Sequence, residues 1–188
     1  LGGMFKAPFM AYLAVTSYIF INEFGVSETT FSIFFAIISG SMLIGPVLYM
    51  KLHHLPYKWI INSCFAIVFT SAALLTVIGH LKPVYFVLSF MPFAIVNTFI
   101  RPYVSELLLA SQRQNVGAAS SVMNFGFTAI GSFGMMFGSL PWSSFINGLV
   151  YTLVLFGGLS LLLWIFILKF GLMEIGGKQQ RKEAAVGE

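Results

Sequence analysis

Six long apolar stretches, separated by short polar connections, occupy most of the chain. They cover residues 4–24, 29–50, 58–79, 83–104, 115–140 and 147–170. Each has about the 20 residues that an α-helix needs to cross a hydrocarbon core of ~30 Å. None alternates between apolar and polar residues as the strands of a membrane barrel do. The pattern therefore predicts an all-α, polytopic membrane bundle with six transmembrane helices, which takes up residues 1–170.

The two ends of the chain differ from each other. Residues 171–188 are polar and lack apolar periodicity, which predicts a disordered tail. The other end begins with LGGMFKAPFM, almost inside the first apolar stretch and without a polar leader. This abrupt beginning suggests the C-terminal half of a longer protein.

Basic residues indicate which side of the membrane each connection occupies. The second connection contains Lys51 and Lys58, the fourth contains Arg113, and the tail holds further Lys and Arg residues. The first and fifth connections contain neither type, and the third contains only Lys82. Because Lys and Arg in short loops stay on the cytoplasmic side, the even-numbered connections are predicted to be cytoplasmic. With six spans, both chain ends and the tail are then cytoplasmic.

Composition disfavours several classes of function. Hydrophobic residues make up 58% of the chain and charged residues 9%, whereas soluble domains have roughly 25% charged residues. The basic residues lie mostly at span ends and in the tail, so the net charge of +4 does not indicate a nucleic-acid partner. His53, His54 and His80 all lie in connections. Intramembrane proteases and haem proteins need His within the membrane, so we expect no enzyme activity, metal or cofactor.

Two passages resemble a known family of transporters. The first is Tyr-Ile-Phe-Ile-Asn-Glu-Phe-Gly-Val-Ser at 18–27, followed by Phe-Ser-Ile-Phe-Phe-Ala at 31–36. The second is Gly-Ala-Ala-Ser-Ser-Val-Met-Asn-Phe-Gly at 117–126, after a loop that contains Gln and Arg. They resemble spans seven, eight and eleven of major facilitator superfamily drug exporters of the bicyclomycin-resistance (Bcr/CflA) branch. Span order and loop length are similar over nearly the whole chain.

The resemblance implies half of a major facilitator superfamily fold, with an N-terminal six-helix half as its partner. It implies a protein of the bacterial inner membrane that exports drug-like small molecules in exchange for protons. In such a half, the first and fourth spans line a central cavity, the second and fifth lie beside them, and the third and sixth face lipid. The superfamily's signature loop belongs to the other half. Its weaker counterpart here, from Gly45 to Lys51 and Lys58, lacks the acidic residue.

Polar residues within the spans are the candidates for solute binding, because burying them in a membrane is costly. Tyr12 and Thr16 lie one helical turn apart and share a face. Further polar residues follow a helical spacing along the fifth span. The cavity candidates are Tyr12, Thr16, Asn97, Ser121, Asn124 and Thr128. Hydrogen bonding between packed helices is the alternative role for these side chains.

Three charged residues are candidates for gating or ion pairing. Arg101 is the only Arg within a predicted span, about 27 Å along the helix from Pro83. Arg101 and the nearby Glu106 either reach the cytoplasmic headgroups or form ion pairs with the partner half when a cytoplasmic gate closes. Glu23 ends the first span on the outer side, where it is either solvated or involved in proton coupling.

Glycine and proline positions predict how the spans pack and bend. Gly134 and Gly138 form a Gly-x-x-x-Gly pair, which allows two helix backbones to approach closely. Pro46 and Pro92 lie inside predicted spans and are expected to kink them.

Three classes of function fit these patterns. The first is the C-terminal bundle of a proton-coupled secondary transporter that exports small amphipathic molecules by alternating access. The second is a free-standing six-span protein that forms a dimeric pore or carrier. The third is a membrane scaffold without transport activity, whose basic tail binds a cytosolic partner.

Overall fold

The computed structural model of the chain describes residues 2–110 and 116–169, apart from the side chains at positions 2, 57, 103, 106–110 and 116. The described residues form helices and no strand. In chain order the elements are α1 Gly2–Tyr18, the π-helical segment η1 Ile19–Glu23, α2 Glu28–Ser41, α3 Ile44–Leu52, α4 Tyr57–Val77, α5 Pro83–Ala110, α6 Val116–Gly138 and α7 Phe145–Lys169. The predicted all-α fold is therefore confirmed for this part of the chain. The tail predicted at 171–188 lies outside the described residues.

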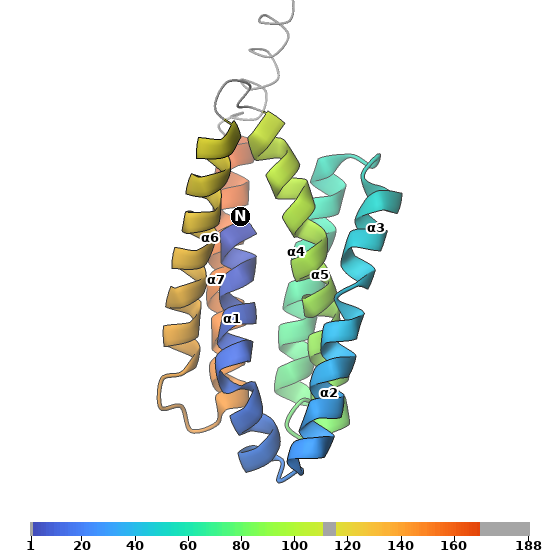
Figure 1. Cartoon of the computed structure of the whole chain (residues 1–188), viewed down its shortest axis with the longest axis vertical. Helices are drawn as coiled ribbons and strands as arrows, with labels where there is room; N and C mark the ends of the chain where they lie inside the picture. Colours follow the sequence, from blue (N-terminus) through green and yellow to red (C-terminus); the bar gives the residue numbers. More distant parts are fainter. Residues whose placement is uncertain (1, 111–115, 170–188) are drawn as a thin grey trace, which may run out of the picture.

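The helices run up and down along one common direction (Figure 1). Helix α1 continues into η1, and α2 is followed by α3, so the chain passes along the long axis six times. Helices α3 and α5 end, and α4 and α6 begin, at the top of Figure 1. We call this end of the bundle the upper end. Helices α6, α1, α5 and the α2–α3 pair form the nearer layer, here called the front layer. Helices α4 and α7 lie behind them and contact each other.

Five helical stretches are long and apolar enough to cross a membrane. They are Gly3–Glu23, Glu28–Leu52, Lys58–Val77, Pro83–Pro102 and Phe145–Lys169. Helix α6 has 23 residues but is not among them, because Gly, Ser, Thr and Asn residues lower its hydropathy. The chain is therefore a multi-pass helical membrane bundle. A sixth crossing by α6 stays a prediction.

The second predicted span is interrupted between α2 and α3. Met42 and Leu43 form the break, and Pro46 follows in the first turn of α3. Pro46 has no N–H to donate to the Met42 carbonyl four residues earlier. The Thr98 hydroxyl of α5 donates to that carbonyl at 2.8 Å, so α5 supplies a hydrogen bond that Pro46 cannot make. The predicted distortion at Pro46 is confirmed.

Gly45 allows α3 to pack directly on the backbone of α5. A Cβ atom at Gly45 would lie 2.8 Å from both the Ile95 carbonyl oxygen and the Phe99 backbone nitrogen. It would also collide with the Thr98 hydroxyl. Only a residue without a side chain permits this approach, which fixes the α2–α3 break against α5.

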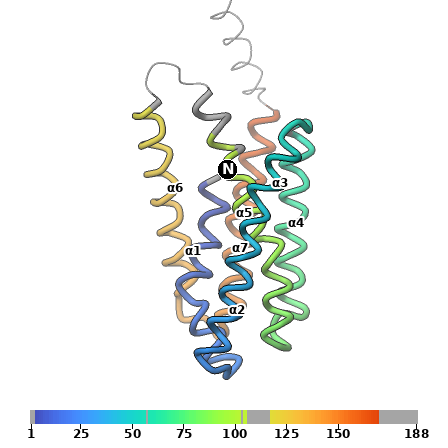
Figure 2. The backbone as a smooth tube through the Cα atoms, turned by 45° about the vertical axis from the view of Figure 1, so that its right-hand side comes forward, coloured from blue at the N-terminus to red at the C-terminus, as the bar shows by residue number. Residues whose placement is uncertain are grey.

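Glycines also place α6 against α1 at the edge of the bundle (Figure 2). A Cβ atom at Gly134 would lie 2.6 Å from the Ala7 Cα atom, and one at Gly138 would lie 3.1 Å from the Ala11 Cα atom. The packing role predicted for the Gly134–Gly138 pair is confirmed. Because α6 contacts α1 through its glycine face, its other faces are left exposed.

Aromatic side chains and one polar contact complete the packing. Tyr12 of α1 stacks on Phe90 of α5 with ring centroids 4.3 Å apart. Such a pair contributes about 0.5–1.5 kcal/mol beyond the area that it buries. In the back layer, the buried indole Nε1 of Trp164 donates to the Asn62 side-chain oxygen at 3.1 Å, which links α7 to α4.

Candidate solute-binding site

A small pocket lies where the four components of the front layer meet. Its volume is about 90 Å³. The lining residues come from α1, the α2–α3 break, α5 and α6, and they are Lys6, Phe9, Met10, Met42, Asn97, Thr98, Arg101 and Phe127. These elements correspond to the first, second, fourth and fifth predicted spans. We call this cavity the front pocket.

Two basic side chains share the front pocket. Arg101 lies nine residues before the end of α5, which is about 14 Å along the helix axis. Lys6 comes from the second turn of α1 and is partly buried. Among the side chains that the structure describes, only Glu23 and Glu28 carry carboxylates, and both lie toward the opposite, lower end of the bundle. The described part of the pocket is therefore positively charged and attracts anions.

Of the two described neutral polar side chains that line the front pocket, only one is available to hydrogen-bond a ligand. The Thr98 hydroxyl is occupied, because it donates to the Met42 carbonyl. The Asn97 amide is half-buried and has no hydrogen-bond partner among the groups that the structure describes. Asn97, a predicted cavity residue, thus lines the front pocket and keeps free donors and an acceptor for a ligand.

Tyr12 and Thr16, the cavity candidates of the first span, do not line the front pocket. Tyr12 is 1% exposed and Thr16 is 4% exposed. The Tyr12 ring belongs to the aromatic core, yet its hydroxyl has no hydrogen-bond partner among the described residues, and the same holds for the Thr16 hydroxyl. Buried polar atoms without partners are uncommon in proteins and mark sites where strain or function keeps them.

The polar stripe of α6 is exposed at the edge of the front layer. Ser121, Asn124 and Thr128 are all exposed. Ser121 donates to the Gly117 carbonyl at 3.0 Å and Thr128 donates to the Asn124 carbonyl at 2.9 Å. Both hydroxyls are thus satisfied within α6 itself rather than by another helix. The alternative role, hydrogen bonding between helices, does not account for these two residues in the described bundle.

Glu23 connects the end of η1 to the start of α7. Its carboxylate accepts hydrogen bonds from the backbone N–H of Phe145 and from the Ser144 hydroxyl, the latter at 3.0 Å. A carboxylate at a helix N-terminus satisfies free N–H groups and interacts favourably with the helix dipole. The structure therefore gives Glu23 a capping role at the lower end of the bundle, which sequence reasoning did not anticipate because Ser144 and Phe145 are distant in the chain.

Replacing Glu23 with Gln removes the charge of this cap. We expect Glu23→Gln to lower the free energy of unfolding by about 1 kcal/mol, the usual value of a helix cap. Reversible unfolding in mixed micelles measures the change. In a double-mutant cycle with Ser144→Ala, the two losses should not add, because both changes disrupt one contact. Full additivity would contradict the capping role.

Sequence reasoning identified one of the two described cations of the front pocket and missed the other. Arg101 lines the front pocket, whereas the side chain of Glu106 lies outside the described residues. Lys6 was missed, although a Lys within an apolar span is itself a signal of function. No sequence pattern pairs Lys6 with Arg101, because they lie on helices distant in the chain.

Comparisons with protein-family models, with curated proteins and with solved structures found no match for this chain.

Proposed function

We propose that the chain is the C-terminal bundle of a proton-coupled secondary transporter of the major facilitator superfamily. Six spans of this bundle, α6 included, cross the bacterial inner membrane with the upper end toward the cytoplasm. Together with an N-terminal six-helix half, it exports small amphipathic molecules by alternating access. The solute path follows the front layer, and the exported molecules carry a negatively charged group.

The observation that carries this proposal is the front pocket with Lys6 and Arg101. Charged residues within membrane spans are costly and usually belong to substrate or ion paths. Two cations with no carboxylate among the described residues of the pocket favour an anionic ligand, because opposite charges attract across a site lined largely by apolar side chains. The available Asn97 amide adds a hydrogen-bonding anchor beside them.

The size of the front pocket favours a site completed by a second bundle. At about 90 Å³ it is smaller than the roughly 300–1,000 Å³ of typical ligand pockets. It therefore accommodates the charged group of a solute, while the rest of the molecule contacts the partner half. The exposed polar stripe of α6 supports the same arrangement, because polar side chains are unfavourable when they face lipid.

The interrupted second span also supports transport. Broken helices next to a solute site are common in secondary transporters, because their irregular backbone lines a cavity. Here the break contributes Met42 to the front pocket, and Thr98 of α5 holds its carbonyl.

A drug-susceptibility assay tests the proposal. An efflux-deficient bacterial strain that expresses the natural gene product containing this chain should tolerate higher concentrations of anionic amphipathic drugs than a strain with an empty plasmid. A protonophore should abolish the difference. Unchanged tolerance to anionic, neutral and cationic amphipathic drugs would contradict export. Tolerance conferred by this chain alone would show that a second copy, rather than a different half, completes the transporter.

The unpartnered Tyr12 hydroxyl gives a prediction that separates function from stability. Tyr12→Phe removes a hydroxyl without a described partner, so the free energy of unfolding should change by less than about 0.5 kcal/mol. In the proposed transporter this hydroxyl contacts solute when the bundle opens, so export should fall about tenfold, which corresponds to the loss of one hydrogen bond of about 1.4 kcal/mol. Unfolding measurements and export assays of the same variant check both values, and Phe90→Leu, which alters the ring contact, serves as the packing control.

A further inference from the structure

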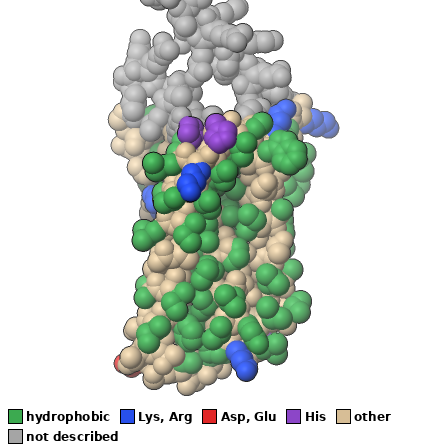
Figure 3. All heavy atoms as spheres, turned by 90° about the vertical axis from the view of Figure 1, so that its right-hand side faces the viewer, with side chains coloured by type: hydrophobic (Ala, Val, Ile, Leu, Met, Phe, Trp, Pro, Cys, Tyr) green, Lys and Arg blue, Asp and Glu red, His purple; other side chains and the backbone are tan. Residues whose placement is uncertain are grey.

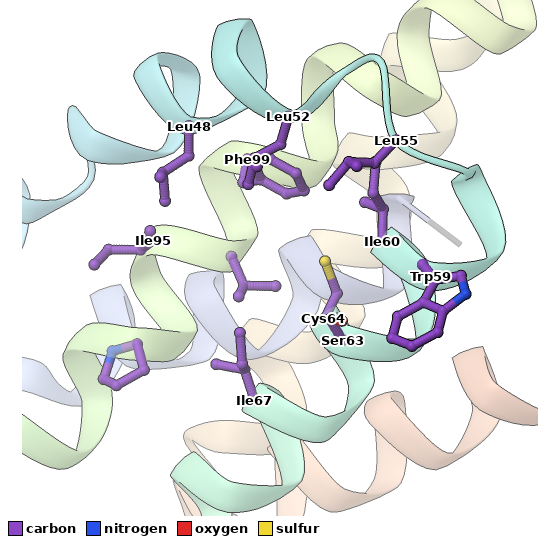
Figure 4. A pocket seen from close by; sticks show the side chains of 12 residues that line it. Leu48, Leu52, Leu55, Trp59, Ile60, Ser63, Cys64, Ile67, Ile95 and Phe99 are labelled. Carbon is purple, nitrogen blue, oxygen red and sulfur yellow. The ribbon is translucent and has the colours of Figure 1, made fainter.

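A second cavity is larger than the front pocket and shares no lining residue with it. It is a groove of about 360 Å³ between α3 and α4, with α5 as its floor. Leu48 and Leu52 line it from α3, Ile67 from α4 and Ile95 and Phe99 from α5, as Figure 4 shows. Its exposed lining is almost entirely apolar, although Ser63 and Cys64 also border it. Its volume lies in the range of sites that hold a ligand.

The upper mouth of this groove has the features of a membrane interface. Trp59 stands at the mouth and is 75% exposed, and Trp is enriched where lipid tails meet headgroups. Lys51, His53, His54 and Lys58 are exposed on the last turn of α3, the loop after it and the first turn of α4. Figure 3 shows Lys or Arg and His side chains toward the upper end of the bundle, above many hydrophobic side chains.

Within the part of the chain that the structure describes, Lys51 adds an unpaired positive charge to the mouth. Lys51 has no ion-pair partner there, and the described carboxylates of Glu23 and Glu28 lie at the lower end. Helix α4 begins at Tyr57, and the preceding Pro56 provides no side-chain cap. The positive end of the α4 helix dipole therefore lies near the mouth, where it favours an anionic oxygen.

We propose that the α3–α4 groove is a binding site for one anionic phospholipid of the cytoplasmic leaflet. One acyl chain lies in the apolar groove between Leu52 and Ile67, and the phosphate lies at the mouth near Lys51 and Lys58. The apolar lining suits any acyl chain, so the basic mouth gives the preference for an anionic headgroup. This site shares no residue with the front pocket, and only its place in the cytoplasmic leaflet rests on the orientation given in the proposed function.

Brominated lipids test the site, because bromine on an acyl chain quenches a nearby Trp. The full chain is placed in phosphatidylcholine nanodiscs that contain either brominated phosphatidylglycerol or brominated phosphatidylcholine at the same low mole fraction. The fluorescence of Trp59 is obtained by subtracting the fluorescence of the Trp59→Phe variant from that of the unchanged chain. We expect brominated phosphatidylglycerol to quench Trp59 at a concentration at least about fivefold lower than brominated phosphatidylcholine. Each basic residue near an anionic headgroup raises the affinity about fivefold.

Matched variants show whether the groove and the basic mouth are responsible. Lys51→Gln should reduce the preference for phosphatidylglycerol about fivefold. Lys51→Arg, which keeps the charge, should leave the preference unchanged. Lys82→Gln should also leave it unchanged, because Lys82 lies at the other end of the bundle. Ile67→Phe should reduce quenching by filling the groove. Leu74→Phe is its control, because Leu74 is on the same helix, equally exposed, and not part of this groove. Unchanged circular dichroism confirms folding of each variant.

Equal quenching by the two brominated lipids would overturn the proposal and leave only bulk lipid in the groove. So would a preference that survives Lys51→Gln, or quenching that Ile67→Phe and Leu74→Phe reduce equally.

Discussion

Replacing Arg101 with Gln should abolish most of the export of anionic solutes while leaving the bundle folded. Arg101 is exposed on the front layer and lines the front pocket, so its loss removes a charged donor rather than a packing contact. A hydrogen bond to a charged group contributes about 1.5–3 kcal/mol, which corresponds to roughly a tenfold to hundredfold loss of affinity. Uptake of a radiolabelled anionic solute into inverted membrane vesicles measures the effect.

Three comparisons make this result specific. Lys6→Gln should reduce export of the same solute in the same direction, because both cations line the pocket. Arg101→Lys should retain part of the activity, since it keeps the charge but loses the planar pair of donors. Lys82→Gln, at the lower end, should have no effect. A normal export rate in Arg101→Gln with a normal amount of protein in the membrane would contradict a role for the front pocket.

Replacing Gly45 with Ala should strongly destabilise the bundle. The added methyl group would collide with the Thr98 hydroxyl and lie 2.8 Å from the backbone of α5, and neither a helix backbone nor a hydrogen-bonded hydroxyl can move away freely. Overpacking of this kind costs about 1–3 kcal/mol and sometimes more. Reversible unfolding in mixed micelles measures the change.

Gly40 is the matched control for this substitution. It lies in α2, one residue before the end of that helix, and a Cβ atom there would meet nothing within 4 Å. Gly40→Ala should therefore be neutral or stabilise the protein by up to about 1 kcal/mol, through the lower backbone entropy of the unfolded chain. Equal effects of the two substitutions would contradict the close approach of α3 and α5.

The fold class could be predicted from the sequence because a membrane restricts a chain to very few solutions. Long apolar stretches predict helices that satisfy their own backbone hydrogen bonds, and the structure has a helix in each of the six stretches. Pro46 and the Gly134–Gly138 pair were also informative, since the missing N–H and the missing side chain have local consequences. Helix α6 shows the limit of hydropathy, because its packing glycines and polar stripe make it less apolar than the other spans.

The candidate site was only partly predictable because it depends on contacts between distant helices. Arg101 and Asn97 were identified from their place in an apolar span, and both line the front pocket. Lys6 was missed because its importance comes from sharing that pocket with Arg101. Glu23 was proposed for gating or coupling, but its cap on α7 depends on how two loops meet at the lower end. Periodicity places residues on a face of one helix, yet it does not show which helix lies opposite.

Cysteine accessibility along α6 tests most directly whether the front layer borders an aqueous solute path. Cys64 is the one cysteine of this chain, so Cys64→Ala gives a cysteine-free background for single substitutions. Asn124→Cys and Thr128→Cys lie on the polar stripe, whereas Phe125→Cys and Phe133→Cys lie on the apolar face, and all four positions are exposed in the described bundle. If the polar stripe borders water, a charged, water-soluble maleimide should label the first pair at least tenfold faster than the second. Equal labelling of the two pairs, or labelling of neither, would contradict the account.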